Sequence, residues 1–256
     1  MAAARPESLS VLDDLRVAAI FLTRLPLRPR RPIGLADLAA SVHMFPVVGL
    51  LLGLAAAFVT LLAGLWGVAP VPTALLGLAT LVVSTGALHE DGLADTADAL
   101  GVGEDRERAL AVMRDARIGA WGATALTLSL LLRGSALAAL PDPAALAATL
   151  VAAAAVSRAA MPVVMHLQPS ARASGLAAGA GRPERERVIT GLAVAAVAAL
   201  ALLPLGTALG SLLAAALAAA GVATFLGRRF GGCTGDTLGA VQQVTEIAFL
   251  LAASAR

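Results

Sequence analysis

The sequence predicts an all-α integral membrane protein, a polytopic bundle of about seven transmembrane helices with an interfacial or re-entrant helix near its N-terminus. Hydrophobic residues make up 59% of the 256 positions and charged residues only 14%, whereas soluble domains have about 25% charged residues. The mean hydropathy is +0.85. The apolar residues also form runs of about 20, the length that a helix needs to cross a bilayer. We therefore treat residues 1–256 as a single integral membrane domain.

Residues 1–41 are expected to form a cytoplasmic or interfacial segment before the first span. The apolar run from Val17 to Leu27 is too short to cross a bilayer and is interrupted by Arg24 and Pro26. Such a segment is typical of an interfacial or re-entrant helix. The arginines that follow it are expected at the lipid headgroups, and they are Arg28, Arg30 and Arg31.

Seven windows are apolar enough to be spans, and they cover residues 42–66, 70–88, 121–140, 144–165, 188–203, 206–226 and 237–253. Arginines gather before the first window, between the second and third, between the fourth and fifth, and after the sixth. Short arginine-rich loops stay in the cytoplasm. The pattern therefore predicts that every second loop is cytoplasmic, with short, nearly uncharged turns on the opposite side.

The remaining composition limits the kinds of site the chain can hold. Cys233 is the single cysteine, so no internal disulfide forms. His43, His89 and His166 have no zinc-like spacing with cysteine, so we expect no zinc site. The net charge of +2 gives no indication of a nucleic-acid partner. The lipid bilayer is the partner that this composition predicts.

Residues 89–120 are predicted to be a cytoplasmic acidic loop that begins where the second window ends. Within it, Asp91, Asp95 and Asp98 have i, i+4 and i+7 spacing and would share one face of a helix. Carboxylates this close repel one another, so a cation should offset them. Mg²⁺ prefers carboxylate oxygens and is often completed by substrate phosphates. The alternative is a solvated acidic loop without a ligand.

Further polar residues fall near the predicted cytoplasmic ends of the spans. Asp115 and Arg117 precede the third window and could add a metal ligand and a phosphate contact, or could simply anchor that helix. Arg158 lies inside the fourth window, where pairing with an acid or binding an anion is favoured over snorkelling. Arg133 is expected to snorkel or pack on the far side.

The glycine-rich segment 231–236 precedes the seventh window and could present backbone N–H groups to a phosphate, although such turns between membrane helices are also common. Asp236, Gln243 and Glu246 could then line one inward face of the last span. The basic connector that carries Arg172 could close over an anionic substrate, or it could be a plain hydrophilic loop.

Taken together, these stretches resemble the cobalamin synthase (adenosylcobinamide-GDP ribazoletransferase) family over nearly the whole chain. The matching stretches are Phe21-Leu22-Thr23-Arg24-Leu25-Pro26, Phe45-Pro46-Val47-Val48-Gly49 with Gly53, Leu88 to Leu100, Met113 to Gly119, Ser157-Arg158, Arg172 with Ser174-Gly175, and Gly231 to Asp236 with Gly239 and Glu246.

The resemblance implies that α-ribazole or its 5′-phosphate attacks the cobinamide-linked phosphate of adenosylcobinamide-GDP, giving adenosylcobalamin or its 5′-phosphate and GMP. It implies Mg²⁺ as the cofactor, a bacterial cytoplasmic (inner) membrane location and an active site that faces the cytoplasm. A homo-oligomer and contacts with other cobalamin-assembly enzymes are left open.

On this basis each residue has an expected role. The expected metal ligands are Glu90, Asp91, Asp95, Asp98, Asp115 and Asp236, and the general base is expected to be Asp98 or Glu246. The expected phosphate or substrate contacts are Arg117, Arg158, Arg172, Gly232, Thr234 and Gly235.

Two other functions are weighed against this one. CDP-alcohol phosphatidyltransferases also expel a nucleoside monophosphate, but their Asp-Gly-x-x-Ala-Arg motif is absent, because Gly92 is followed by Leu93-Ala94-Asp95. A transporter would place acids near mid-membrane, whereas here they gather at one cytoplasmic mouth.

Overall fold

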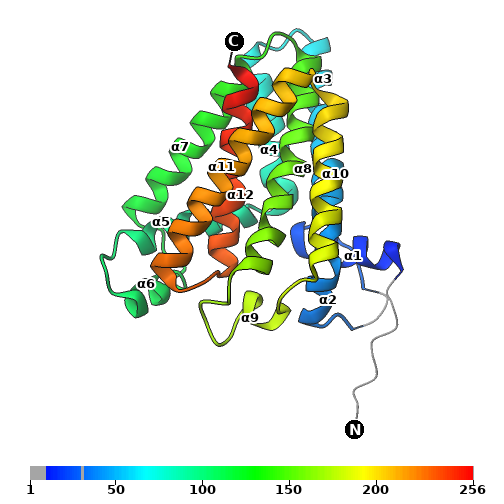
Figure 1. The fold of residues 1–256 in the computed structure, drawn as a ribbon. Helices are drawn as coiled ribbons and strands as arrows, with labels where there is room; N and C mark the ends of the chain where they lie inside the picture. Colours follow the sequence, from blue (N-terminus) through cyan, green and yellow to red (C-terminus); the bar gives the residue numbers. More distant parts are fainter. Residues whose placement is uncertain (1–9, 30–31, 256) are drawn as a thin grey trace.

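The computed structural model describes residues 10–29 and 32–255, which fold into a bundle of α-helices (Figure 1). The long helices are α3 (Phe45–Leu65), α4 (Pro70–Thr85), α7 (Ala120–Ala138), α8 (Pro143–Leu167), α10 (Arg185–Leu202), α11 (Leu205–Phe230) and α12 (Gly235–Ser254). The short ones are α1 (Val11–Leu22), α2 (Leu35–Ser41), the 3₁₀ helix η1 (Val42–Met44), α5 (Leu88–Leu100), α6 (Arg106–Val112) and α9 (Leu176–Ala180). Figure 1 shows α1, α2, α5, α6 and α9 together at one end of the bundle.

The all-α prediction is confirmed, and each of the seven predicted windows overlaps one long helix. The number of spans is not confirmed. Three helical segments of the described chain are long and apolar enough to cross a membrane: Leu35–Leu65, Pro143–Leu167 and Leu205–Phe230. A fourth passes only if α4 and α5 are taken together, and these two helices meet at a bend of 87°.

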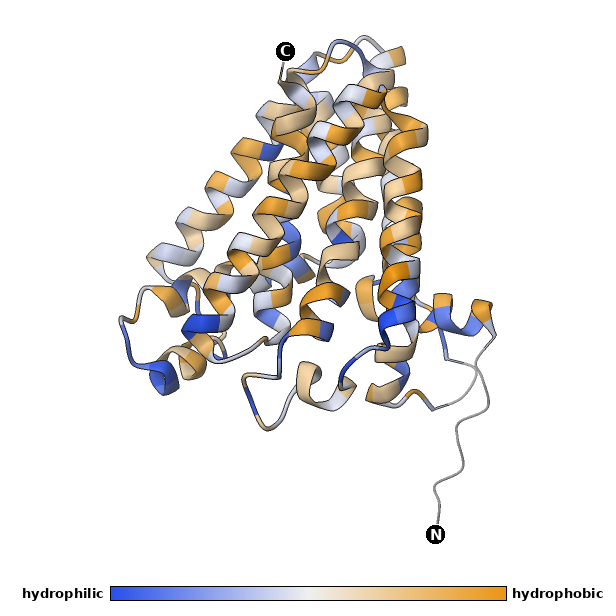
Figure 2. Ribbon diagram, viewed as in Figure 1, coloured by the Kyte–Doolittle hydropathy of each residue, from blue (hydrophilic) through white to orange (hydrophobic). Residues whose placement is uncertain are grey.

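The outer surface of the bundle is apolar, as a surface in contact with lipid should be. Large side chains such as Phe58 of α3, Leu131 of α7 and Leu217 of α11 are all more than half exposed, at 68%, 62% and 65%. Figure 2 shows hydrophobic residues along the long helices and most hydrophilic residues near the end where the short helices lie. The chain is therefore suited to a bilayer, with its polar chemistry at one end.

Helix α8 is the centre of the bundle, because 83% of its most apolar window is buried. Its alanines let other helices approach closely. A Cβ added to Gly49 of α3 would lie 2.3 Å from the carbonyl oxygen of Ala154, and one added to Gly53 would lie 2.6 Å from Cα of Val151. Packing through small residues, which membrane helices commonly use, is thus present between α3 and α8.

The acidic segment is set aside from the membrane-crossing part by the break between α4 and α5. Gly86 and Ala87 both adopt left-handed backbone conformations, with φ of 65° and 59°, and so end α4. Within residues 89–120, α5 and α6 are helical, and the helix expected to carry Asp91, Asp95 and Asp98 is present. Because α5 meets α4 at a bend of 87°, the acids of α5 do not continue the axis of α4.

The N-terminal segment also packs on this end of the bundle. Helix α1 stops at Leu22, before Pro26, and buries Val17, Ala18 and Leu22. Asp14 of α1 pairs with Arg187 of α10, with 3.1 Å between Oδ2 and Nη1. Of the arginines expected at the headgroups, Arg30 and Arg31 lie outside the described residues.

Candidate active site

The site begins where α5 crosses α12 at two glycines. A Cβ on Gly92 would lie 2.8 Å from the carbonyl oxygen of Asp236, and one on Gly239 would lie 3.2 Å from Cα of Gly92. Only glycine allows this approach of the two backbones. The crossing brings the acidic helix α5 against the first turn of α12, and so joins two segments that are far apart in the sequence.

Three carboxylates gather around this crossing. Asp91 is exposed, and Asp95, one turn further along α5, and Asp236 of α12 are partly buried. Burial and then the negative charges of Asp91, Asp236 and Asp98 raise the pKa of Asp95 from 3.8 to about 7. The site therefore holds more negative charge than its surroundings neutralise.

Arg172 supplies positive charge beside these acids. Its Nη1 lies 3.4 Å from Oδ2 of Asp236, and its Nη2 donates to the carbonyl of Leu110 at 3.0 Å. The buried Nε of Arg172 has no hydrogen-bond partner in the described structure. Of the three arginines expected to contact phosphate, this one is brought to the acids at the crossing.

The fit of a metal ion to these residues can be judged from their chemistry. No three His, Cys, Asp or Glu side chains within residues 10–29 and 32–255 are grouped as a ready metal site. Mg²⁺, however, is commonly held by one or two carboxylates plus substrate phosphates. The crowded carboxylates on the exposed side of α5 provide such oxygen ligands, and their mutual repulsion would be relieved by a cation.

Asp98 is placed differently from Asp91 and Asp95. Its two carboxylate oxygens accept hydrogen bonds from the backbone N–H groups of Gly119, at 2.7 Å, and Gly122, at 2.8 Å. It therefore caps the first turn of α7 from a neighbouring helix, where a negative charge is favoured. This geometry gives Asp98 a positioning role and leaves it poorly placed as a free general base.

Asp115 and Arg117 form an exposed pair in the connection between α6 and α7. The Nη2 of Arg117 lies 2.6 Å from Oδ2 of Asp115, and its Nε donates to the other oxygen at 3.0 Å. Hydrogen bonds from Arg117 lower the pKa of Asp115 to about 2. These two side chains satisfy each other, and the structure does not bring them to the cavity at the crossing.

The two glutamates expected at the site lie instead in a buried ion-pair network. Arg133 of α7 is 1% exposed. Its Nη2 lies 3.1 Å from Oε1 of Glu90, and its Nη1 lies 3.1 Å from Oε1 of Glu246. The prediction that Arg133 snorkels or packs at the far side is therefore wrong. Glu246 also accepts from Gln242 at 2.7 Å and from Ser157 at 3.2 Å.

Arg158 belongs to the same interior and is only 2% exposed. Its Nη1 donates to the carbonyl of Ala154 at 3.0 Å. Its burial excludes snorkelling, as expected, but its hydrogen-bond partner is a backbone carbonyl, and the expected ion pair with an acid is not found among the described residues. Neither it nor Glu246 lines the cavity described below, so the geometry favours a structural role for both.

The glycine-rich segment before α12 is held by its own hydrogen bonds. The N–H of Gly232 donates to Gly227, that of Cys233 to Pro169, and that of Thr234 to the hydroxyl of Thr237. Thr234 in turn caps α12 by accepting from the N–H of Thr237 at 3.1 Å. Gly232 and Thr234 are thus engaged structurally, and of the three expected phosphate contacts in this segment Gly235 lines the cavity.

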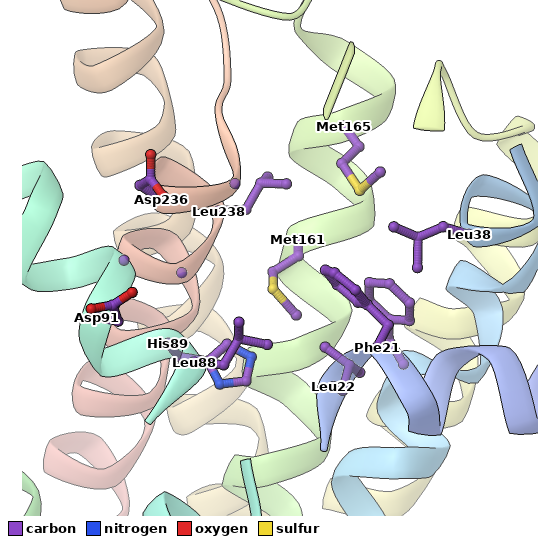
Figure 3. A pocket seen from close by; sticks show the side chains of 14 residues that line it. Phe21, Leu22, Leu38, Leu88, His89, Asp91, Met161, Met165, Asp236 and Leu238 are labelled. Carbon is purple, nitrogen blue, oxygen red and sulfur yellow. The ribbon is translucent and has the colours of Figure 1, made fainter. Parts of the chain in front are cut away.

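A cavity of about 210 Å³ opens beside the crossing. Figure 3 shows Asp91 and Asp236 on one side of it and Phe21, Leu22 and Leu38 on the other, with Met161 and Met165 between them. The sequence does not predict this role for Phe21 and Phe45, because nothing in the pattern of apolar residues near a membrane distinguishes a cavity wall from a core.

The fold and site thus define an α-helical membrane protein with an acidic and partly apolar site at one end of its bundle. The family model for cobalamin-5-phosphate synthase matches residues 14–254. The chain therefore belongs to the cobalamin-5-phosphate synthase family. No solved structure matches it.

Curated relatives cover almost the full length of the chain. The adenosylcobinamide-GDP ribazoletransferase of Mesorhizobium japonicum is 47% identical over 244 residues, which are 95% of this chain and 93% of that protein. The protein of the same name from Bradyrhizobium diazoefficiens is 46% identical, over 96% and 95% of the two chains. A third, from Rhizobium etli, is 44% identical over 93% and 95%. These matches support the transferase interpretation over the two alternatives.

Proposed function

We propose that this chain is an adenosylcobinamide-GDP ribazoletransferase. It would transfer the cobinamide phosphate group of adenosylcobinamide-GDP to α-ribazole or α-ribazole 5′-phosphate, giving adenosylcobalamin or its 5′-phosphate and GMP. The observation that carries this proposal is the meeting of Asp91, Asp95 and Asp236 with Arg172 beside a cavity, in a chain whose full-length relatives bear that name.

The reaction is a phosphoryl transfer from the bridging oxygen of a pyrophosphate to a hydroxyl oxygen of the acceptor ribose. An oxygen of the acceptor ribose forms a bond to the cobinamide-linked phosphorus, and the bond from that phosphorus to the bridging oxygen breaks. GMP leaves with the bridging oxygen, and the hydroxyl proton passes to a carboxylate. Catalysis of such a step depends mainly on positioning and on neutralising charge.

Asp91 and Asp95 are our choices for holding Mg²⁺, because they lie one turn apart on α5 and have no arginine partner among the described residues. When bound, Mg²⁺ would neutralise negative charge on the pyrophosphate oxygens. This revises the expected ligand set, because Glu90 pairs with Arg133, Asp115 with Arg117, and Asp98 caps α7.

Arg172 and Asp236 would act as a pair. A guanidinium can form two parallel hydrogen bonds with a phosphate. Arg172 already pairs with Asp236, which lines the cavity, and its Nε has no partner in the described structure. When Arg172 moves onto the substrate phosphate, Asp236 loses its partner and becomes available to accept the hydroxyl proton. We therefore assign the proton acceptor to Asp236 in place of Asp98 or Glu246.

We further propose that the seven long helices cross the bacterial inner membrane and that the site faces the cytoplasm. The arginine-rich connections support this orientation. The short helices and the acids lie at the same end (Figure 1), so a water-soluble nucleotide substrate would reach the site without crossing the bilayer.

The test is transfer by the purified protein in liposomes, comparing wild type with Asp236→Asn. Wild type should release GMP only when adenosylcobinamide-GDP, α-ribazole 5′-phosphate and Mg²⁺ are all present. Asp236→Asn should lower kcat by about 10²- to 10⁴-fold, as loss of a general base does, at an unchanged Mg²⁺ half-saturation. No GMP from folded wild-type protein would reject the function, and a shifted Mg²⁺ half-saturation in the variant would make Asp236 a metal ligand.

A further inference from the structure

The apolar part of the cavity has the size and lining of a site for a flat aromatic ring system. Its volume is about 210 Å³, and a cavity of roughly 150 Å³ holds a benzene ring. Phe21 and Phe45 stack in its wall with ring centroids 6.0 Å apart and planes at 23°. Met161 and Met165 line it as well, and methionine sulfur packs favourably against aromatic rings. The cavity is large enough for a bicyclic ring and far too small for a corrinoid macrocycle.

One polar group interrupts this apolar lining. His89 lines the cavity and is 2% exposed, and its Nε2 is buried without a hydrogen-bond partner in the described structure. A buried polar atom left without a partner is destabilising. A neutral imidazole protonated on Nε2 can donate one hydrogen bond. His89 is therefore suited to a ligand that brings a single acceptor atom into an otherwise apolar space.

We propose that this cavity binds the aromatic base of the nucleoside acceptor, with a ring nitrogen of the base accepting a hydrogen bond from Nε2 of His89. This inference rests on the proposed function and names the acceptor subsite. The carboxylates lie at the opposite side of the cavity from Phe21 (Figure 3). A base held among the aromatic and methionine side chains would thus extend its ribose toward Asp91 and Asp236.

The guanine of the donor fits this cavity less well. Guanine carries an exocyclic amine, a carbonyl and several ring nitrogens, and burying them without partners is costly. Beyond the acids at its rim, the cavity offers His89 as its polar side chain. An apolar bicyclic heterocycle with one unsubstituted ring nitrogen, such as benzimidazole, matches both the lining and its single donor.

The experiment compares two acceptors in wild type and in His89→Phe. One acceptor is a benzimidazole nucleoside 5′-phosphate, and the other is the matching indole nucleoside, in which a C–H replaces the acceptor nitrogen. In wild type the KM for the indole acceptor should be about tenfold higher, as expected for one hydrogen bond. In His89→Phe the two acceptors should have equal KM values, while the KM for adenosylcobinamide-GDP changes less than about twofold.

The variant His89→Gln provides the matched control, because it keeps an N–H donor and should retain part of the preference for benzimidazole. The proposal would be overturned if His89→Phe kept the full difference in KM between the benzimidazole and indole acceptors. It would also be overturned if the KM for adenosylcobinamide-GDP rose as much as the KM for the acceptor. Should wild type transfer nothing, free benzimidazole and indole are compared by equilibrium dialysis with folded protein. Tighter binding of benzimidazole that disappears in His89→Phe would then support the subsite without the reaction, and equal binding would reject it.

Discussion

Substituting Gly92 by alanine should disrupt both the fold and the site, because Gly92 is where α5 and α12 touch. The new Cβ would lie 2.8 Å from the carbonyl oxygen of Asp236, 3.1 Å from its Cα and 3.2 Å from Cα of Gly239. Ordinary contact begins at 3.4 Å. All three neighbours are backbone atoms, so the helices must separate because no flexible side chain can yield.

The expected cost follows from this overlap. Overpacking of this kind destabilises by about 1–3 kcal/mol, which should appear as a lower melting temperature in detergent. Moving α5 away from α12 also moves Asp91 relative to Asp236, and a displacement of about 1 Å can reduce catalysis by about 10²-fold. We therefore expect kcat for GMP release to fall by roughly 10- to 100-fold.

The matched control is Gly210→Ala in α11, where a Cβ would have no neighbour within 4 Å. Replacing this helical glycine should leave activity unchanged and stabilise by about 0.5–1 kcal/mol. Wild-type activity and melting temperature in Gly92→Ala would refute the close crossing. Equal losses in both variants would show that any added methyl group is harmful and that the crossing is not special.

Three further changes test other parts of the structure. Arg133→Met leaves Glu90 and Glu246 buried without their cation and should cost about 3–5 kcal/mol; a melting temperature within error of wild type would contradict the buried pairs. Because folding raises the pKa of Asp95 from 3.8 to about 7, the folded state binds more protons between these pH values, so stability should fall as the pH rises from about 4 to about 7. Mg²⁺ should therefore raise the melting temperature more at about pH 8 than at about pH 6, and equal shifts would argue against Asp95 as a ligand. Asp98→Ala should lower stability by about 0.5–2 kcal/mol through loss of a cap, without changing the Mg²⁺ half-saturation; a weaker Mg²⁺ dependence would restore Asp98 as a ligand.

Hydropathy was sufficient to predict the long helices, because each apolar run must form its backbone hydrogen bonds internally in a bilayer. The helical spacing of Asp91 and Asp95 also predicted carboxylates together on α5. These features depend on residues close together in the sequence, where periodicity is informative.

The misjudged residues are those whose partners lie far along the chain. Arg133 contacts Glu246, 113 positions away, and no local pattern indicates that pairing. Asp98 continues the helical spacing of Asp91 and Asp95, but the backbone N–H groups of Gly119, just before α7, and Gly122, in its first turn, donate to its carboxylate oxygens. His89 gains a role only because α5 brings it to a cavity whose other walls come from α1, α2, α3, α8 and α12. Tertiary packing decides such roles.

The most direct test of the central claim is a Mg²⁺ titration of GMP release in wild type, Asp91→Asn and Glu107→Gln, the last an exposed acid of α6. If the carboxylates of α5 hold the metal, Asp91→Asn should raise the Mg²⁺ half-saturation by about 10-fold or more, since loss of one charged ligand costs at least about 1.4 kcal/mol. Glu107→Gln should match wild type. Identical titrations for all three proteins would contradict the account.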